Sequence, residues 1–218
     1  MRRMIRSLSV WVLVLASLTL PPLAGPELVL AADATVTTCD ENNFDAALAA
    51  VQGSGGGTIT FACGGTIFFS GQKTISSDVT IVGGGSVTFD GQGATRLFRV
   101  NLGASLSLDG LTLQNGNAGA FEGGAILNNL GSLDIRASTF SGNNAGQSGG
   151  AIFSTASTLT VRDSTFSGNN ADNTGGAIFH ANGVATVTNS TFTGNVASSG
   201  GGALYSGGHA TRRRQHLQ

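Results

Sequence analysis

Residues 149–174 read GGAIFSTASTLTVRDSTFSGNNADNT, and residues 175–200 read GGAIFHANGVATVTNSTFTGNVASSG. The two segments have the same length and share two motifs, GGAIF at the start and STF followed by Ser or Thr and GN in the second half. Across the chain, both motifs recur every 26 residues: GGAI or GGAL begins at Gly123, Gly149, Gly175 and Gly201, and STF begins at Ser138, Ser164 and Ser190. Two motifs that keep one period without an insertion indicate a repeat protein whose units stack on one another.

The residues inside each unit predict strands. The segments LDIRASTF, LTVRDSTF and ATVTNSTF alternate apolar with polar residues and are rich in Thr and other β-branched side chains. The Gly and Asn clusters between them supply the positive-φ positions that tight bends require. A β-propeller blade usually needs about 40 residues or more. We therefore predict an all-β fold, a right-handed parallel β-helix with one repeat per turn.

Stacking of the turns at about 4.8 Å places equivalent residues on top of one another. The repeat then predicts an aromatic stack, an aliphatic stack and a polar stack: Phe140, Phe166 and Phe192; Ile126, Ile152 and Ile178; Asn143, Asn169 and Asn195. The asparagine amides of the polar stack can hydrogen-bond to the turns above and below. We interpret all three stacks as structural.

A second row follows the aliphatic stack by one residue and consists of Leu127, Phe153, Phe179 and Tyr205. Since side chains alternate along a strand, this row points outward if the aliphatic stack points inward. An exposed aromatic row can stack on sugar rings or meet a protein partner. The alternative is that a bulge buries both rows or that neighbouring loops cover the outer one.

The charged residues do not form the clusters that are typical of a catalytic or metal site. Arg136 and Arg162 occupy equivalent positions and can contact an anionic glycan, or can simply be solvated surface residues. The acidic residues are scattered singly and form no row of carboxylates, so we predict no catalytic residue, no metal and no cofactor. His180 is expected to be exposed at a bend.

The chain is expected to have four parts. Residues 1–32 have the positive start, apolar core and small-residue exit site of a secretory signal peptide. Residues 33–57 form an N-terminal cap with a short helix over 40–51, residues 58–208 form the β-helix, and 209–218 form an anomalous basic tail in which the apolar alternation stops. An even number of cysteines in an exported chain predicts a disulfide between Cys39 and Cys63.

Composition excludes several classes of protein. The 218 residues include 34 Gly and only 3 Pro without a Gly-X-Y period, which excludes collagen. A net charge of -1 with 40% hydrophobic residues excludes a disordered chain and gives no reason to expect a nucleic-acid partner. No stretch after residue 32 is long and apolar enough to cross a bilayer.

GGAI combined with the FxxN motif, as in Phe140 to Asn143, resembles the repeats of the polymorphic outer membrane proteins of bacteria. More broadly, the chain resembles the right-handed, pectin-lyase-like β-helix superfamily. The resemblance implies an exported passenger at the bacterial cell surface or outer membrane, or released from it, that acts as an adhesin or binding scaffold for a glycan or a surface protein. Two alternatives stay open: a pectate-lyase-like polysaccharide lyase or glycoside hydrolase, and a truncated passenger fragment without activity. An open C-terminal turn would also allow edge-to-edge self-association.

Overall fold

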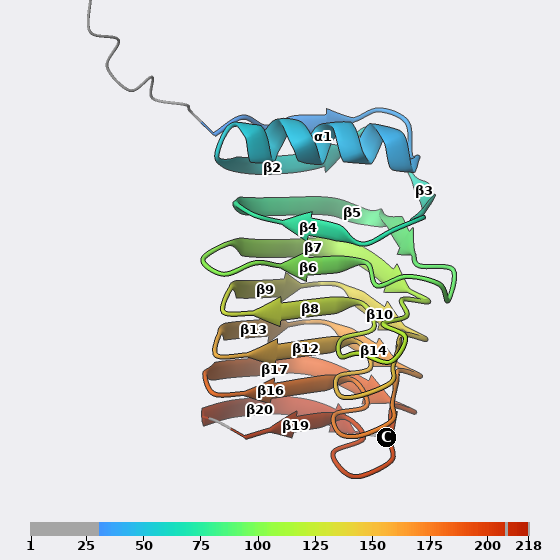
Figure 1. The fold of residues 1–218 in the computed structure, drawn as a ribbon, viewed down its shortest axis with the longest axis vertical. Helices are drawn as coiled ribbons and strands as arrows, with labels where there is room; N and C mark the ends of the chain where they lie inside the picture. The colour runs from blue at the N-terminus through green and yellow to red at the C-terminus, as the bar shows by residue number, and fades with distance from the viewer. Residues whose placement is uncertain (1–30, 208, 218) are drawn as a thin grey trace, which may run out of the picture.

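The structure, a computed structural model, describes residues 31–207 and 209–217, and only the backbone of the latter segment. These residues form a parallel β-solenoid of about seven turns, stacked along one axis (Figure 1). The predicted signal peptide lies almost wholly outside the described residues. The prediction of a parallel β-helix with an N-terminal helix is confirmed.

Three sheets form the walls of the solenoid, and all their strand pairs are parallel. The largest sheet has 11 strands: β1 (Ala34–Val36), β2 (Gly56–Phe61), β3 (Gly65–Phe68), β5 (Asp78–Asp90), β7 (Ser105–Gln114), β9 (Ser132–Arg136), β10 (Thr139–Ser141), β13 (Thr158–Arg162), β14 (Thr165–Ser167), β17 (Val184–Thr193) and β20 (His209–Leu217). The second sheet has six: β4 (Lys73–Ile75), β6 (Phe98–Val100), β8 (Ile126–Asn129), β12 (Ile152–Thr155), β16 (Ile178–Ala181) and β19 (Leu204–Ser206). The third has three: β11 (Asn144–Ala145), β15 (Asn170–Ala171) and β18 (Val196–Ala197).

Helix α1 (Glu41–Gly53) lies across the N-terminal end of the stack (Figure 1). Asp40 caps it by accepting a hydrogen bond from the backbone N–H of Asn43 at 2.9 Å. One face of the helix is buried and carries Phe44, Ala47, Leu48 and Val51. The Phe44 ring packs against Phe89 with 4.9 Å between ring centroids. The helix therefore closes the apolar interior where no further turn covers it.

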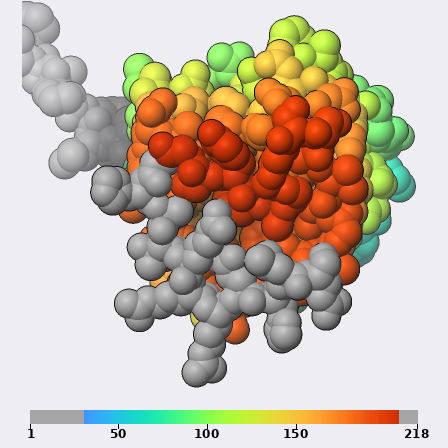
Figure 2. Space-filling view, turned by 90° about the horizontal axis from the view of Figure 1, so that it is seen from below, coloured from blue at the N-terminus to red at the C-terminus, as the bar shows by residue number. Residues whose placement is uncertain are grey.

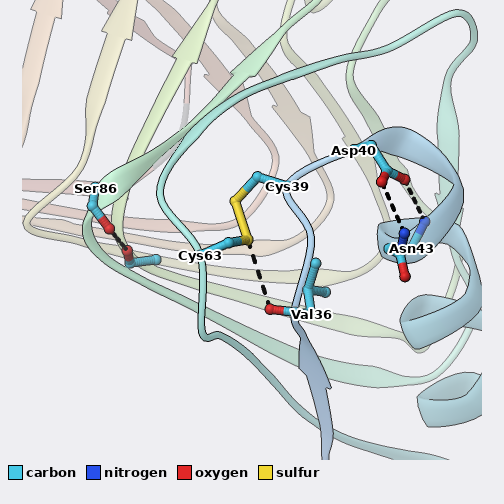
Figure 3. The surroundings of a disulfide bond; sticks show 7 residues. Val36, Cys39, Asp40, Asn43, Cys63 and Ser86 are labelled. Atoms are coloured by element: carbon cyan, nitrogen blue, oxygen red, sulfur yellow. Dashed lines mark hydrogen bonds between the residues drawn. A yellow bond between two sulfur atoms is a disulfide. The ribbon is translucent and has the colours of Figure 1, made fainter.

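The predicted disulfide between Cys39 and Cys63 is confirmed (Figure 3). It joins the segment just before α1 to the segment after β2, with the two Cα atoms 5.7 Å apart. Lys73 adds an electrostatic link, because its Nζ lies 2.7 Å from both Glu41 Oε1 and Asp45 Oδ2 on the helix. Both links hold the cap against the first turns.

The aromatic stack lies in the core. Phe140, Phe166 and Phe192 are almost completely buried, and their rings lie 4.8 and 4.9 Å apart with interplanar angles of 7° and 6°. The aliphatic stack of Ile126, Ile152 and Ile178 is fully buried on the second sheet and is extended by Leu204. The interior is therefore filled by like residues in contact along the axis.

The asparagine stack satisfies the buried backbone at one corner. Asn143 donates through Nδ2 and through its backbone N–H to Oδ1 of Asn169, at 2.9 and 3.0 Å, and Asn169 does the same to Asn195. A serine stack of Ser138, Ser164 and Ser190 works in a similar way. The backbone N–H of Ser138 donates to the Ser164 hydroxyl, and that of Ser164 donates to the Ser190 hydroxyl. The sequence analysis did not identify this serine stack, although the STF motif contains it.

The paired glycines of each repeat lie where the backbone passes close to itself. Gly149 has φ of 72°, and a Cβ there would collide with the Ile152 carbonyl oxygen. A Cβ on Gly150 would collide with the carbonyl oxygen of Gly176 in the next turn. Only glycine fits both positions, which explains the GG pair at the start of every unit.

The backbone of the basic tail continues the largest sheet beyond residue 208, where the sequence analysis placed the end of the β-helix. Strand β20 pairs in parallel with β17, with Val184 opposite His209 and Phe192 opposite Leu217. The step is 25 residues, whereas β13 and β17 are offset by 26. Loss of apolar alternation therefore did not end the strand, because ladder hydrogen bonds use the backbone of any residue. Figure 2 looks from below onto this end of the solenoid.

Candidate binding surfaces

The outer aromatic row (Leu127, Phe153, Phe179 and Tyr205) lies on the outside of the second sheet. Its members are direct register neighbours on β8, β12, β16 and β19. Phe153 and Phe179 are half-buried, whereas Tyr205 is 40% exposed. The row is therefore accessible to solvent along part of its surface.

The rings of this row cover one another. The centroids of Phe153 and Phe179 are 4.9 Å apart at an interplanar angle of 4°, and those of Phe179 and Tyr205 are 5.0 Å apart at 3°. Both faces of Phe179 are therefore occupied by neighbouring rings, and mainly its edge meets solvent. A sugar that stacks on an aromatic ring needs a free face. The geometry accordingly suits a side-on contact with the row better than sugar stacking on Phe179.

Arg136 and Arg162 are register neighbours on β9 and β13 and are both exposed. Arg162 Nη2 lies 3.7 Å from Asp134 Oδ2, and both side chains are about half exposed. Such an exposed ion pair contributes at most about 1 kcal/mol. The two arginines thus form a small solvated row with acidic neighbours, because Asp109 is the register neighbour of Arg136.

The expectation that His180 is an exposed bend residue is wrong. His180 is the third residue of β16, two positions after the inward-facing Ile178, so the strand period turns its side chain into the solenoid. It is fully buried in register with Ser154, and neither ring nitrogen has a hydrogen-bond partner. Burial lowers the pKa of the His180 imidazole from its ordinary value, because desolvation penalises the charged form.

This burial predicts a loss of stability in mild acid. Above the ordinary histidine pKa of 6.5, His180 is neutral in both the folded and the unfolded chain and contributes no pH dependence. Below pH 6.5, His180 binds a proton in the unfolded chain but stays neutral in the folded chain, until the pH falls to the lower pKa of the folded state. We expect the free energy of unfolding to fall through this window, with a slope approaching about 1.4 kcal/mol per pH unit.

Urea unfolding between about pH 8 and about pH 5 measures this effect. The matched control is His180→Ser, since Ser154 and Ser206 hold the equivalent position in the adjacent turns. The variant keeps His209 and His216, so the difference between the two pH profiles isolates His180. Equal pH slopes for the variant and the unchanged chain would contradict this prediction.

A polar corner follows the end of β5, where three successive turns line an open cavity of about 340 Å³. Asp90 is only 7% exposed and accepts hydrogen bonds from the backbone N–H of Gln92 and from the side-chain amides of Gln114 and Asn115. Asn115 has φ of 52° at a bend where the next turn has Gly142 at 60°. The sequence analysis found no site here, and the available signal was an asparagine where later turns have glycine.

In the part of the chain that the structure describes, no group of three or more His, Cys, Asp and Glu side chains lies close enough together to hold an ion. In the polar corner, the hydrogen-bond donors already aimed at the Asp90 carboxylate occupy the positions that a cation would need.

Comparison with known protein families finds a match for the C-terminal turns. The family model of the Chlamydia polymorphic membrane protein repeat matches residues 137–155, 163–181 and 189–207. These turns are similar to polymorphic membrane protein repeats. The resemblance inferred from GGAI and FxxN is thereby confirmed over this part of the chain. No curated protein and no solved structure matches the chain.

Each segment that matches the family model spans the same structural parts. Residues 137–155, for example, contain β10, β11 and β12, and so supply one member each of the phenylalanine, asparagine and isoleucine stacks. The repeats also supply Phe153, Phe179 and Tyr205 of the outer aromatic row. Asp90, Gln92 and Asn115 of the polar corner lie upstream of the matched residues. Among the described residues, no helix has the length and apolar character needed to cross a bilayer.

Proposed function

We propose that this chain is an exported protein of the bacterial cell surface that acts as an adhesin or binding scaffold. The observation that carries the proposal is the set of polymorphic membrane protein repeats, which form one continuous parallel solenoid. The Cys39–Cys63 disulfide supports export, since disulfides persist in oxidising compartments. Residues 1–32 would direct that export as a signal peptide.

The outer surface supports binding rather than catalysis as the activity of the solenoid. Its strands present uncharged hydroxyl rows, such as Thr139, Thr165 and Thr191, which are register neighbours. The outer aromatic row adds half-exposed apolar edges on the second sheet. Aromatic side chains and Arg are the residues enriched where proteins meet partners. A glycan or a surface protein is the partner that these features fit.

The test has two parts. The full-length gene is expressed in a Gram-negative host, and intact cells are treated with a protease that does not enter them. Loss of the chain from intact cells, together with binding of the purified chain to glycan-bearing cells, is the expected result. A chain that stays protected inside the cell, or that binds neither cells nor glycans, would overturn the proposal.

A further inference from the structure

The polar corner is half of a longer groove. A second cavity of about 260 Å³ lies beside the first, and Asn117 lines both. Asn117 joins the two loops that form the groove, because its Nδ2 donates to the Gly93 carbonyl at 2.8 Å and its Oδ1 accepts from the Gly119 N–H at 2.8 Å. The groove is thus built by the segments 91–96 and 115–121, together with the following turn. Both cavities are open to solvent, so the groove can take an extended ligand along its surface.

The first cavity has free hydrogen-bonding groups held in fixed positions. Asn115 commits its Nδ2 to both carboxylate oxygens of Asp90, at 3.1 and 3.0 Å, so its Oδ1 remains without a partner among the described residues. Gln92 likewise commits its Nε2 to the Phe69 carbonyl and keeps Oε1 free. Asn144 accepts from Asn170 through Oδ1 and keeps its Nδ2 free to donate. Asp90 acts here as a positioning residue for the two acceptors.

The second cavity adds an apolar surface. Phe121 lines it and is 63% exposed. Unlike Phe153 and Phe179, Phe121 makes no ring contact with another aromatic residue in the described chain. Its ring face is therefore available for an apolar ligand surface, such as the C–H face of a sugar ring.

The electrostatics of the groove disfavour an anionic ligand. Arg96 lines the second cavity, but its Nε and Nη2 donate to the carbonyl oxygens of Gly123 and Glu122, and its Nη1 donates to Gln72 Oε1. Burial lowers the pKa of Arg96 from its ordinary value, because desolvation penalises the charged form. Its hydrogen bonds to protein oxygens mark it as a structural cation. Asp90 is the other charged residue that lines the two cavities, and Glu122 acts electrostatically on Arg96. The exposed polar groups are neutral amides.

We propose that this groove binds a neutral oligosaccharide, with hydroxyl groups at Gln92, Asn115 and Asn144 and a second sugar ring against Phe121. Sugar hydroxyls both donate and accept, which matches two free amide oxygens and one free amide nitrogen. The proposal deepens the proposed function by naming the ligand class and the place where it binds. It moves the glycan site away from the outer aromatic row to the junction between the irregular turns and the first matched repeat, which supplies Asn144.

The experiment begins with the purified disulfide-bonded chain on a printed array of neutral and uronic-acid oligosaccharides of about two to six units. The neutral oligosaccharide bound best is then titrated calorimetrically against two variants. Asn115→Gly removes the free acceptor. Glycine fits this bend, because the equivalent positions of the next two turns are Gly142 and Gly168. Phe121→Ala removes the exposed ring. We expect the dissociation constant to rise roughly tenfold or more for Asn115→Gly and about three- to tenfold for Phe121→Ala.

Matched controls lie outside the groove. Asn189→Gly also removes an asparagine of positive φ that donates to an aspartate, Asp163, of the previous turn. Leu102→Ala removes a 75% exposed apolar side chain that lines a different cavity. Both controls are expected to bind within about twofold of the unchanged chain.

Each result separates the groove from the wider proposal. Undiminished glycan binding by both groove variants would show that the groove is not the glycan site. The proposed binding function would still hold. Binding of uronic-acid oligosaccharides alone would overturn the assignment of a neutral ligand. Binding of cells but of no glycan on the array would show that the groove is not a glycan site. The proposed function would then require a protein partner.

Discussion

Replacing Phe166 with alanine is expected to lower the free energy of unfolding by about 3–5 kcal/mol. Phe166 is fully buried, and both of its faces contact phenylalanine rings, those of Phe140 and Phe192. The substitution opens a cavity in the middle of the stack, and strand pairing on both sides limits how far the neighbouring turns can move to fill it. Denaturant unfolding of the purified variant measures the loss.

Phe153→Ala is the control for this prediction, because Phe153 belongs to the same set of turns but is half-buried on the outer side. It also has an aromatic neighbour, Phe179, at a similar spacing. We expect it to cost about 1 kcal/mol, a typical value for a partly exposed position. Equal losses for the two variants would show that contact within a stack, and not burial in the core, determines stability.

Removing the disulfide is the second large change. The double variant Cys39→Ser with Cys63→Ser is expected to lose about 3–4 kcal/mol, because the bond closes a loop of 24 residues and restricts the unfolded chain. The loop contains α1, so loss of the disulfide frees the helical cap that covers Phe89 and the first turns. Thermal unfolding with and without a thiol reductant checks this, since the chain has 2 cysteines in all.

The double variant provides its own internal test. A reductant should lower the melting temperature of the unchanged chain and leave that of the variant unaffected. The regular turns around Phe166 should keep their strand signal longer than the cap does, because each turn of a solenoid contacts mainly its neighbours. An unchanged melting temperature after complete reduction would mean that Lys73, Glu41 and the apolar face of α1 hold the cap without the bond.

The two glycan hypotheses differ in how they use aromatic rings. The outer aromatic row is regular because the repeat is regular, and that regularity places ring on ring and covers the faces. Phe121 lies in a loop outside the repeat motif and therefore keeps its faces free. The same periodicity that makes a row visible in the sequence thus makes it less suitable for stacking on sugars.

The sequence was sufficient for the features that repeat. A constant spacing of 26 residues determines which residues lie on top of one another, so the Phe140 and Asn143 stacks follow from the motif and the rise between strands. The Asp40 cap, the apolar face of α1 and the Cys39–Cys63 bond are local or follow from an even count of cysteines. These features depend on periodicity and short-range chemistry, both of which can be recognised in the sequence.

Only the tertiary structure decided the features that break the repeat. Whether His180 faces inward depends on how far β16 continues past Ile178, and the register that continues the sheet through β20 depends on backbone pairing and not on side-chain pattern. The groove needs Asp90, Asn115 and Asn144 from three turns, of which the first two lie upstream of the repeats. A repeat determines contacts only at its own period, whereas these contacts depend on how loops of unequal length bring non-equivalent residues together.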